Sequence, residues 1–164
     1  MKTNKWDKIP NIDMDCFGCG PNNHHGLQMT FETNGEKLRS FVTVPDHLRG
    51  WSNIVHGGVL STICDEIMAW AAIYLTKRFI LTRSMTTTFL KPVFTGTKLE
   101  AFGFIKERTD QRNALLSGEI YNEKGELCTV STGEFVLFTP DSFKKLNIIP
   151  DGLLDQMTGM FSRE

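Results

Sequence analysis

The chain has 164 residues, of which 40% are hydrophobic and 23% are charged, and its formal net charge is −1 at pH 7. This length and composition predict one globular domain with its own core. The charge gives no reason to expect nucleic acid or an anionic membrane as the main partner, and no apolar run looks long enough to span a bilayer. The polar N-terminus and a cysteine pattern unlike a disulfide framework favour a cytoplasmic protein.

The N-terminal half predicts an arm, a hairpin and a long helix. Residues 1–26 have many turn residues and little periodicity, so we expect an N-terminal arm on the surface. Strands are expected at 27–32 and 38–44, joined by a turn at Asn34-Gly35. A loop over 46–55 leads to a helix from about Gly58 to Thr76, with apolar residues on more than one side. Such a helix is expected to be wrapped by other elements.

Four further strands are expected, at 83–90, 98–108, 113–121 and 127–138. Short connections and alternating patterning make the last three an antiparallel meander. The order of elements predicts an α+β fold, with a curved antiparallel sheet of about six strands wrapped around one long central helix. We assign this domain to residues 27–140, and residues 141–164 to a C-terminal extension with weak helical spacing.

The start of the long helix concentrates the functional signals. Gly57 and Gly58 leave the backbone bare where the helix begins, so unpaired N–H groups can point at an acceptor. Asp65 and Glu66 place two carboxylates on a helix that is otherwise expected to be buried, where they are costly unless paired or used. Together these features predict an oxyanion site with a general base or nucleophile. In the alternative interpretation, the glycines permit tight packing and the acids make structural contacts.

The spacing of these groups predicts a dimer. Eight positions separate Gly57 from Asp65, about 12 Å along a helix. A carbonyl carbon under attack must lie about 3 Å from both the nucleophile and the oxyanion donors. One helix cannot supply both groups, but two antiparallel copies can, so we expect a symmetric dimer with composite sites.

The helical register separates the two acids. Asp65 shares a stripe with small residues that permit close approach (Ser61, Ala69 and Ala72), and we choose it as the catalytic carboxylate. Glu66 points elsewhere, toward Trp70 and Ile73. His56 is expected to hold the helix entrance through a backbone hydrogen bond in preference to transferring protons.

Several motifs in this order resemble hotdog-fold thioesterases of the phenylacetic-acid-degradation (PaaI-like) type, over residues 16–138. His56-Gly57-Gly58 is followed by Asp65 nine positions after the histidine. The other motifs are Cys16-Phe17-x-Cys19-Gly20-x-x-Asn23-x-x-Gly26-Leu27, Gly50-Trp51-x-x-Ile54-Val55, Asp65-Glu66-x-x-x-Trp70 and Phe89-Leu90-Lys91-Pro92-Val93.

The resemblance implies a homodimer or homotetramer that hydrolyses acyl-CoA thioesters without a cofactor. The family's catalytic positions fall on Asp65, on the Gly57 amide and on His56. Gly58, Asn53 and Thr82 are candidate substrate-binding residues. Some relatives place a hydroxyl or amide group beside the carboxylate, and Thr82, ahead of the third strand, is the candidate for it. Some also carry an Asn or Gln a few residues before the histidine, for which Asn53 is the nearest candidate. The alternative function is a non-hydrolytic acyl-CoA binding or sensing protein on the same fold. A hotdog hydratase is disfavoured because no histidine follows His56.

The N-terminal arm contains a candidate metal site. Cys16-x-x-Cys19 with His24 and His25 offers enough ligands for zinc, but the segment lacks a second Cys-x-x-Cys or a spaced histidine pair. We therefore expect no metal, and an arm held by small buried thiols and turns.

Overall fold

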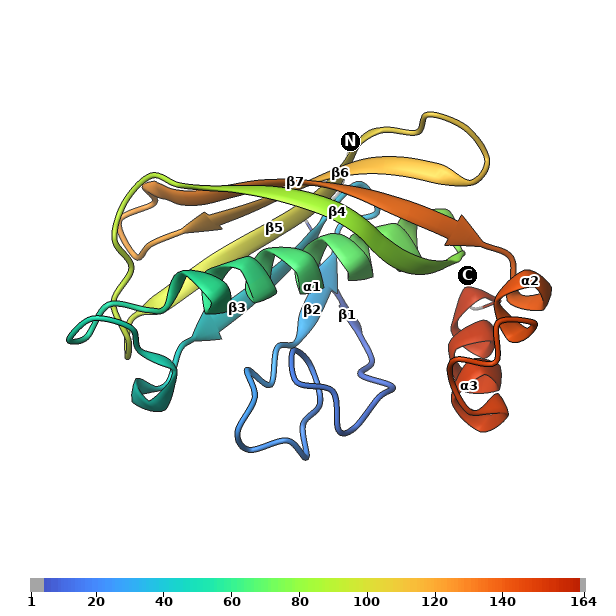
Figure 1. The fold of residues 1–164 in the computed structure, drawn as a ribbon, viewed down its shortest axis with the longest axis horizontal. Helices are drawn as coiled ribbons and strands as arrows, with labels where there is room; N and C mark the ends of the chain where they lie inside the picture. The colour runs from blue at the N-terminus through green and yellow to red at the C-terminus, as the bar shows by residue number, and fades with distance from the viewer. Residues whose placement is uncertain (1–4, 163–164) are drawn as a thin grey trace.

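The computed structural model describes residues 5–162 and shows one antiparallel sheet curved around one long helix (Figure 1). The seven strands run in the order β1-β2-β3-β5-β6-β7-β4. Their bounds are β1 (Asp7–Ile9), β2 (Phe31–Thr33), β3 (Leu38–Thr43), β4 (Phe79–Phe89), β5 (Lys98–Glu107), β6 (Asn113–Tyr121) and β7 (Leu127–Phe138). The expected α+β fold is therefore confirmed, and β4 lies at one edge of the sheet with β7 as its neighbour.

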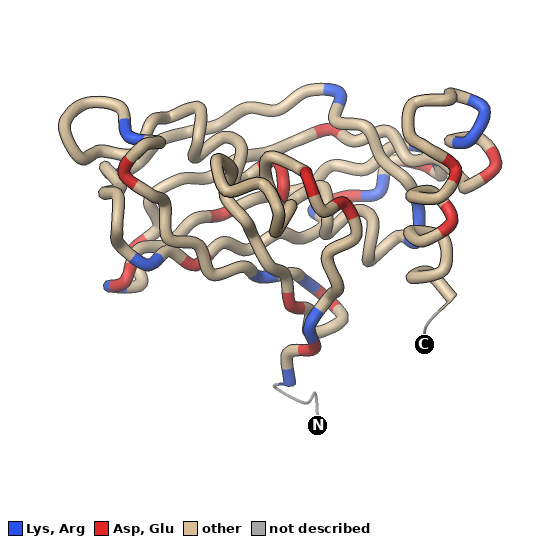
Figure 2. The backbone as a smooth tube through the Cα atoms, turned by 90° about the horizontal axis from the view of Figure 1, so that it is seen from below, with Lys and Arg blue, Asp and Glu red and all other residues tan. Residues whose placement is uncertain are grey.

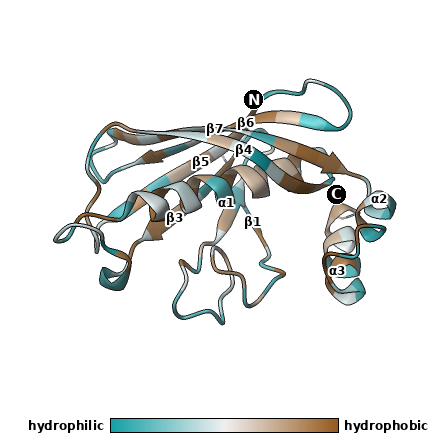
Figure 3. Ribbon diagram, in the orientation of Figure 1, coloured by the Kyte–Doolittle hydropathy of each residue, from teal (hydrophilic) through white to brown (hydrophobic). Residues whose placement is uncertain are grey.

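The central helix α1 (Gly57–Thr76) packs into the concave face of the sheet. Its apolar residues are buried on several sides, from Val59 to Ile73. In Figure 3 the helix is mostly pale, with a teal part among white and light brown ones. A Cβ built on Gly103 would lie 2.3 Å from the Ile67 carbonyl oxygen, so only glycine lets β5 approach the helix this closely. On another side of α1, Trp70 stacks on Phe31 with 5.3 Å between ring centroids. The prediction of a wrapped helix is correct.

The arm is more structured than expected. Residues 7–9 form β1, which pairs with β2, so the sheet has seven strands instead of about six. The predicted strand 27–32 is largely wrong, since only Phe31 and Glu32 of it lie in β2. The backbone N–H groups of Leu27 and Met29 donate instead to carbonyls of Phe17 and Gly18 in the arm. Gln28, with φ 47°, breaks the extended conformation between them.

The later elements follow the expected order with shifted ends. β4 begins at Phe79, four residues before the predicted start at Arg83, because the helix ends sharply at Lys77 in the left-handed conformation (φ 55°). The loop before α1 contains the short helix η1 (Asp46–Leu48). After β7 come two helices, α2 (Pro140–Lys144) and α3 (Asp151–Phe161), which pack around Phe79 and Phe143 beyond the end of the sheet.

The composition led to expectations about surface charge and about membrane-spanning segments. Basic and acidic residues are interspersed along the chain, which is consistent with the net charge of −1 (Figure 2). The expectation that no apolar run could span a bilayer is wrong, since α1 is long and apolar enough by length and composition. Its position against the sheet, with Ile63, Ile67 and Ala71 fully buried, is that of a core helix in this fold.

Candidate active site

The site begins at the N-terminus of α1, where His56 caps the helix. His56 is in an extended conformation (φ −61°, ψ 135°), and its Nδ1 accepts a hydrogen bond of 3.0 Å from the Gly58 N–H. The histidine therefore makes the backbone contact expected from the sequence. The Gly58 amide is already engaged, whereas the Gly57 N–H has no hydrogen-bond partner among residues 5–162. Gly57 thus supplies the unpaired donor at the positive end of the helix dipole.

A shallow apolar pocket of about 280 Å³ opens beside Gly57. Phe89, at the end of β4, contributes a wall to it, and its ring lies 3.3 Å from the position of a Cβ built on Gly57. Phe89 and the adjacent Leu90 are 52% and 51% exposed, so two large apolar side chains lie together at the surface beside this pocket. The helix start therefore faces an apolar surface that is incompletely covered within one chain.

Asp65 lies two turns further along α1 and faces β4. The Thr82 hydroxyl donates a 2.9 Å hydrogen bond to its Oδ1. Burial raises the pKa of Asp65, and the hydrogen bond from Thr82 opposes this rise because it favours the ionised form. Ser61 and Ala69, on the same stripe as Asp65, are also half-buried. A carboxylate of raised basicity is thus fixed in orientation near the open edge of the sheet.

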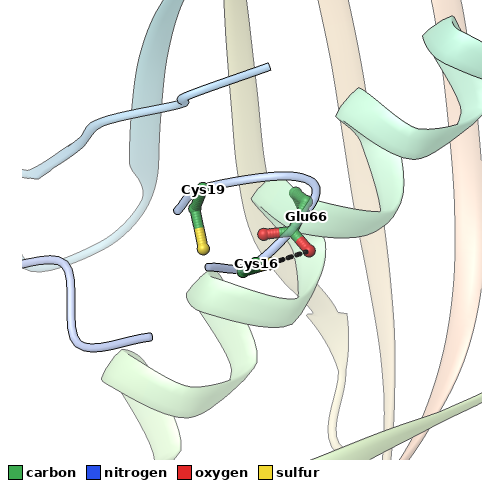
Figure 4. Close-up of side chains that lie close together, drawn as sticks. All are labelled: Cys16, Cys19 and Glu66. Carbon is green, nitrogen blue, oxygen red and sulfur yellow. Dashed lines mark hydrogen bonds between the residues drawn. The ribbon is translucent and has the colours of Figure 1, made fainter. Parts of the chain in front are cut away.

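Glu66 points away from this site, toward the N-terminal arm (Figure 4). Its Oε1 lies 3.8 Å from Cys16 Sγ, and burial raises its pKa to about 7, with a further contribution from the nearby Cys16. The structure thus separates the two acids as the helical register predicts.

The structure brings some of the predicted site residues into contact and leaves others apart. Thr82 meets Asp65, and His56 meets Gly58. Asn53 lies exposed in the preceding turn, where its carbonyl accepts the Thr95 N–H at 2.9 Å. His24 and His25 take no part in the one group of potential metal ligands found among the described residues, which consists of Cys16, Cys19 and Glu66.

Sequence reasoning missed two contacts. The position of Phe89 beside Gly57 links the ends of two elements that are far apart in the chain. The contact of Cys16 with Glu66 was also missed. The signals were present, in the Phe89-Leu90-Lys91-Pro92 strand end and in the adjacent acids, but their spatial partners follow only from the tertiary fold.

Comparison with known proteins finds a family match over part of the chain. Residues 52–129 match the family model described as thioesterase superfamily. No curated protein sequence matches the chain significantly.

Solved structures show the same fold. A thioesterase superfamily protein is 24% identical with a TM-score of 0.68; the match covers 78% of this chain and 66% of that one, just under two thirds of its length. The E. coli PaaI protein from the phenylacetic acid degradation operon is 20% identical with a TM-score of 0.62, over 68% of this chain and 80% of that chain. A hypothetical thioesterase from Streptococcus pneumoniae TIGR4, solved with coenzyme A, is 15% identical with a TM-score of 0.60. The match covers 84% of this chain and 89% of that chain.

The family match covers α1, β4, β5, β6 and the first residues of β7, and the structural likenesses extend the fold over most of the chain. From these findings, the chain matches the thioesterase superfamily model over residues 52–129 and has the hotdog fold of the solved thioesterase structures.

Proposed function

We propose that this protein hydrolyses acyl-CoA thioesters to a free acid and CoA. The observation that carries the proposal is the half-buried Asp65, which is oriented by Thr82 at 2.9 Å on a helix whose first amide, that of Gly57, is unpaired among the described residues. A buried carboxylate and a free helix N-terminal amide are the two groups that acyl transfer from a thioester requires. The thioesterase from S. pneumoniae solved with coenzyme A supports the choice of carrier.

Each group has a defined task in the reaction. The Gly57 N–H donates to the thioester carbonyl oxygen and stabilises the negative charge that develops on it. The ionised Asp65 attacks the carbonyl carbon directly or takes a proton from the attacking water. In either route the C–S bond breaks, and CoA leaves as a thiolate that is then protonated. Thr82 holds the carboxylate in one orientation and favours its charged form.

The two groups act on one substrate only if two chains combine. The exposed edge of β4 offers a place for this, because the strand has 11 residues and β7 pairs with only one of its edges. Thr82 of β4 contacts Asp65, and Phe89 of the same strand lies against Gly57. In an antiparallel β4–β4 pair with its two-fold axis between Met85 and Thr86, Thr82 of one copy lies opposite Phe89 of the other. That register brings Asp65 of one subunit near Gly57 of its partner.

Apolar exposure on β4 and beside it supports this association. Leu81, Phe89 and Leu90 are 38%, 52% and 51% exposed, and a second copy would cover them. We therefore propose a homodimer as the minimal active unit, with a dimer of dimers as the possible larger assembly.

A hydrolysis screen tests the proposal. The purified chain is given short, medium, long and aromatic acyl-CoA esters, and the released thiol is followed with a thiol reagent. We expect turnover by the wild type and a loss of about 10²–10⁴-fold in kcat for Asp65→Asn. The matched control is Asp155→Asn, because Asp155 is exposed on α3 and distant in sequence from the site.

The outcomes separate the two candidate functions. Equal turnover by the wild type and Asp65→Asn would remove Asp65 from the mechanism. Binding of acyl-CoA without turnover of any ester would instead support a binding or sensing protein.

A further inference from the structure

A second cluster of reactive groups lies on the opposite side of the Asp65–Glu66 pair from the proposed hydrolytic site. The Sγ atoms of Cys16 and Cys19 and a carboxylate oxygen of Glu66 all lie within 4.8 Å of one another (Figure 4). Both cysteines are free thiols. They lie in one tight turn, closed by a 2.8 Å hydrogen bond from the Gly20 N–H to the Cys16 carbonyl.

The backbone holds this turn tightly against the helix. A Cβ built on Gly18 would lie 2.2 Å from Glu66 Cγ, and one built on Gly20 would lie 2.3 Å from the Cys16 nitrogen. The loop is also tied to the following segment by the hydrogen bond from the Leu27 N–H to the Phe17 carbonyl, at 2.9 Å. The two thiols therefore stay close to each other and to the carboxylate.

The two cysteines have different environments. Cys16 is half-buried, whereas Cys19 is 3% exposed. The pKa of Cys16 is lowered, chiefly by the hydrogen bond from the Cys19 side chain and also by the backbone N–H groups of Cys19 and Gly18. The pKa of Cys19 is raised by the same contact with Cys16 and by burial. An accessible, acidic thiol beside a buried, protonated one is the arrangement of a dithiol that attacks with the first sulfur and closes with the second.

Glu66 has no positive partner to match its charge. Among residues 5–162, no lysine, arginine or histidine forms an ion pair with it. Its polar neighbours in the arm are the two thiols, and Cys16 Sγ donates to its Oε1 at 3.8 Å. A buried carboxylate without a cation binds protons readily near neutral pH, so it is suited to accept a proton from a thiol.

We propose that Cys16 and Cys19 form a reversible dithiol–disulfide site that exchanges with a small-molecule disulfide, with Glu66 as the proton acceptor. In the first step Glu66 takes the Cys16 proton, the Cys16 thiolate attacks one sulfur of the disulfide, and the first thiolate leaves with the proton from Glu66. In the second step Glu66 takes the Cys19 proton, and Cys19 attacks Cys16 Sγ. The second thiolate then leaves with that proton. Two electrons pass from the protein to the small molecule, which is released as two thiols.

This assignment is stronger than a metal site at the same residues. Structural zinc has four protein ligands, whereas the group here has three among the described residues. His24 and His25, the candidates for completing it, contact Gln28 and His47 instead. The dithiol assignment uses every member of the cluster, and it does not depend on thioester hydrolysis.

The test uses the reduced full-length chain and oxidised glutathione as the disulfide. After incubation at graded ratios of oxidised to reduced glutathione, remaining thiols are alkylated and counted by intact mass. We expect two of the four thiols to be lost, peptide mapping to show the Cys16–Cys19 bond, and dithiothreitol to restore both thiols. This measurement on the wild type needs no variant.

Three variants test the roles. Cys19→Ser should stop at a glutathione adduct on Cys16, and Glu66→Gln should slow disulfide formation at least about tenfold. Cys128→Ser is the control, because that buried cysteine lies outside the cluster, and it should oxidise like the wild type.

Two results would overturn the proposal. One is a wild type that keeps all four thiols at every glutathione ratio. The other is a purified wild type with a stoichiometric divalent metal that blocks oxidation until a chelator removes it, because the cluster would then be a metal site.

Discussion

Replacing Glu66 with Gln should stabilise the folded protein at alkaline pH and leave its stability unchanged at acidic pH. The pKa of Glu66 is raised from 4.5 to about 7, first by burial and then by the neighbouring Cys16. The folded chain therefore binds a proton at this residue more tightly than the unfolded chain does. As pH rises from 4.5 to about 7, the wild type loses stability, and above that range the full penalty is present. Since one pH unit corresponds to about 1.4 kcal/mol, the penalty amounts to about 3 kcal/mol.

Urea unfolding at pH 5 and pH 8 under reducing conditions measures this effect. Tryptophan fluorescence is a suitable signal, because Trp70 is buried against Phe31. The free energy of unfolding of Glu66→Gln should exceed that of the wild type by about 3 kcal/mol at pH 8, and by about 1 kcal/mol or less at pH 5. Glu107→Gln, exposed at the end of β5, controls for the loss of one surface charge. A variant that is less stable than the wild type at pH 8 would refute the reasoning, since it would mean that the carboxylate has a stabilising cationic partner.

Three further predictions concern the proposed hydrolytic site. Gly57→Pro removes the amide N–H at the first helical position, where proline is tolerated and the extended His56 suits a following proline, so kcat should fall about 10²–10³-fold. Gly57→Ala adds a similar Cβ beside Phe89 but keeps the N–H, and a loss as large as that of proline would show that crowding is the cause. Thr82→Val removes the hydrogen bond that lowers the pKa of Asp65, so the acid limb of the kcat/KM profile should move to higher pH. The control is Thr88→Val, at an exposed position of the same strand, which should leave the acid limb in place. An acid limb that does not move in either variant would show that Thr82 does not influence the pKa of Asp65. Co-expressed Asp65→Asn and Gly57→Pro chains should regain about a quarter of wild-type activity, because half of the dimers would be mixed and each would hold one intact composite site; activity no higher than that of the separate variants would place both groups in one chain.

The sequence was sufficient for the parts of the fold that depend on local patterns. The period of the apolar residues predicted α1 to within one residue of its start, and the alternating segments predicted β6 and β7 with the same bounds. It was insufficient where long-range contacts decide. Residues 27–30 have a strand pattern, but their amides pair with the arm, and the left-handed Gln28 interrupts the extended backbone. No local sequence rule predicts that the Leu27 N–H donates to the carbonyl of Phe17, ten residues earlier in an irregular loop.

The candidate site shows the same division. Helical periodicity correctly separated Asp65 from Glu66, and the His56-Gly57-Gly58 motif correctly placed the histidine as the cap of the helix. The partners of the acids were harder to identify, because Thr82 and Cys16 lie 17 and 50 positions from the residues they contact. Thr82 was reached through a family resemblance, and the contact of Cys16 emerged only from the tertiary arrangement.

Phe79 connects the C-terminal helices to β4. Its ring stacks on Phe143 at 4.8 Å and meets Phe161 edge-on at 5.4 Å, while its backbone pairs with Phe138 of β7. Thr82 lies only three residues further along the same strand. Local opening of α2 and α3 would remove the aromatic contacts of Phe79 and would let the first residues of β4 fray. Through that strand, loss of the C-terminal helices would loosen the hydroxyl that orients Asp65, although the two lie far apart in the sequence.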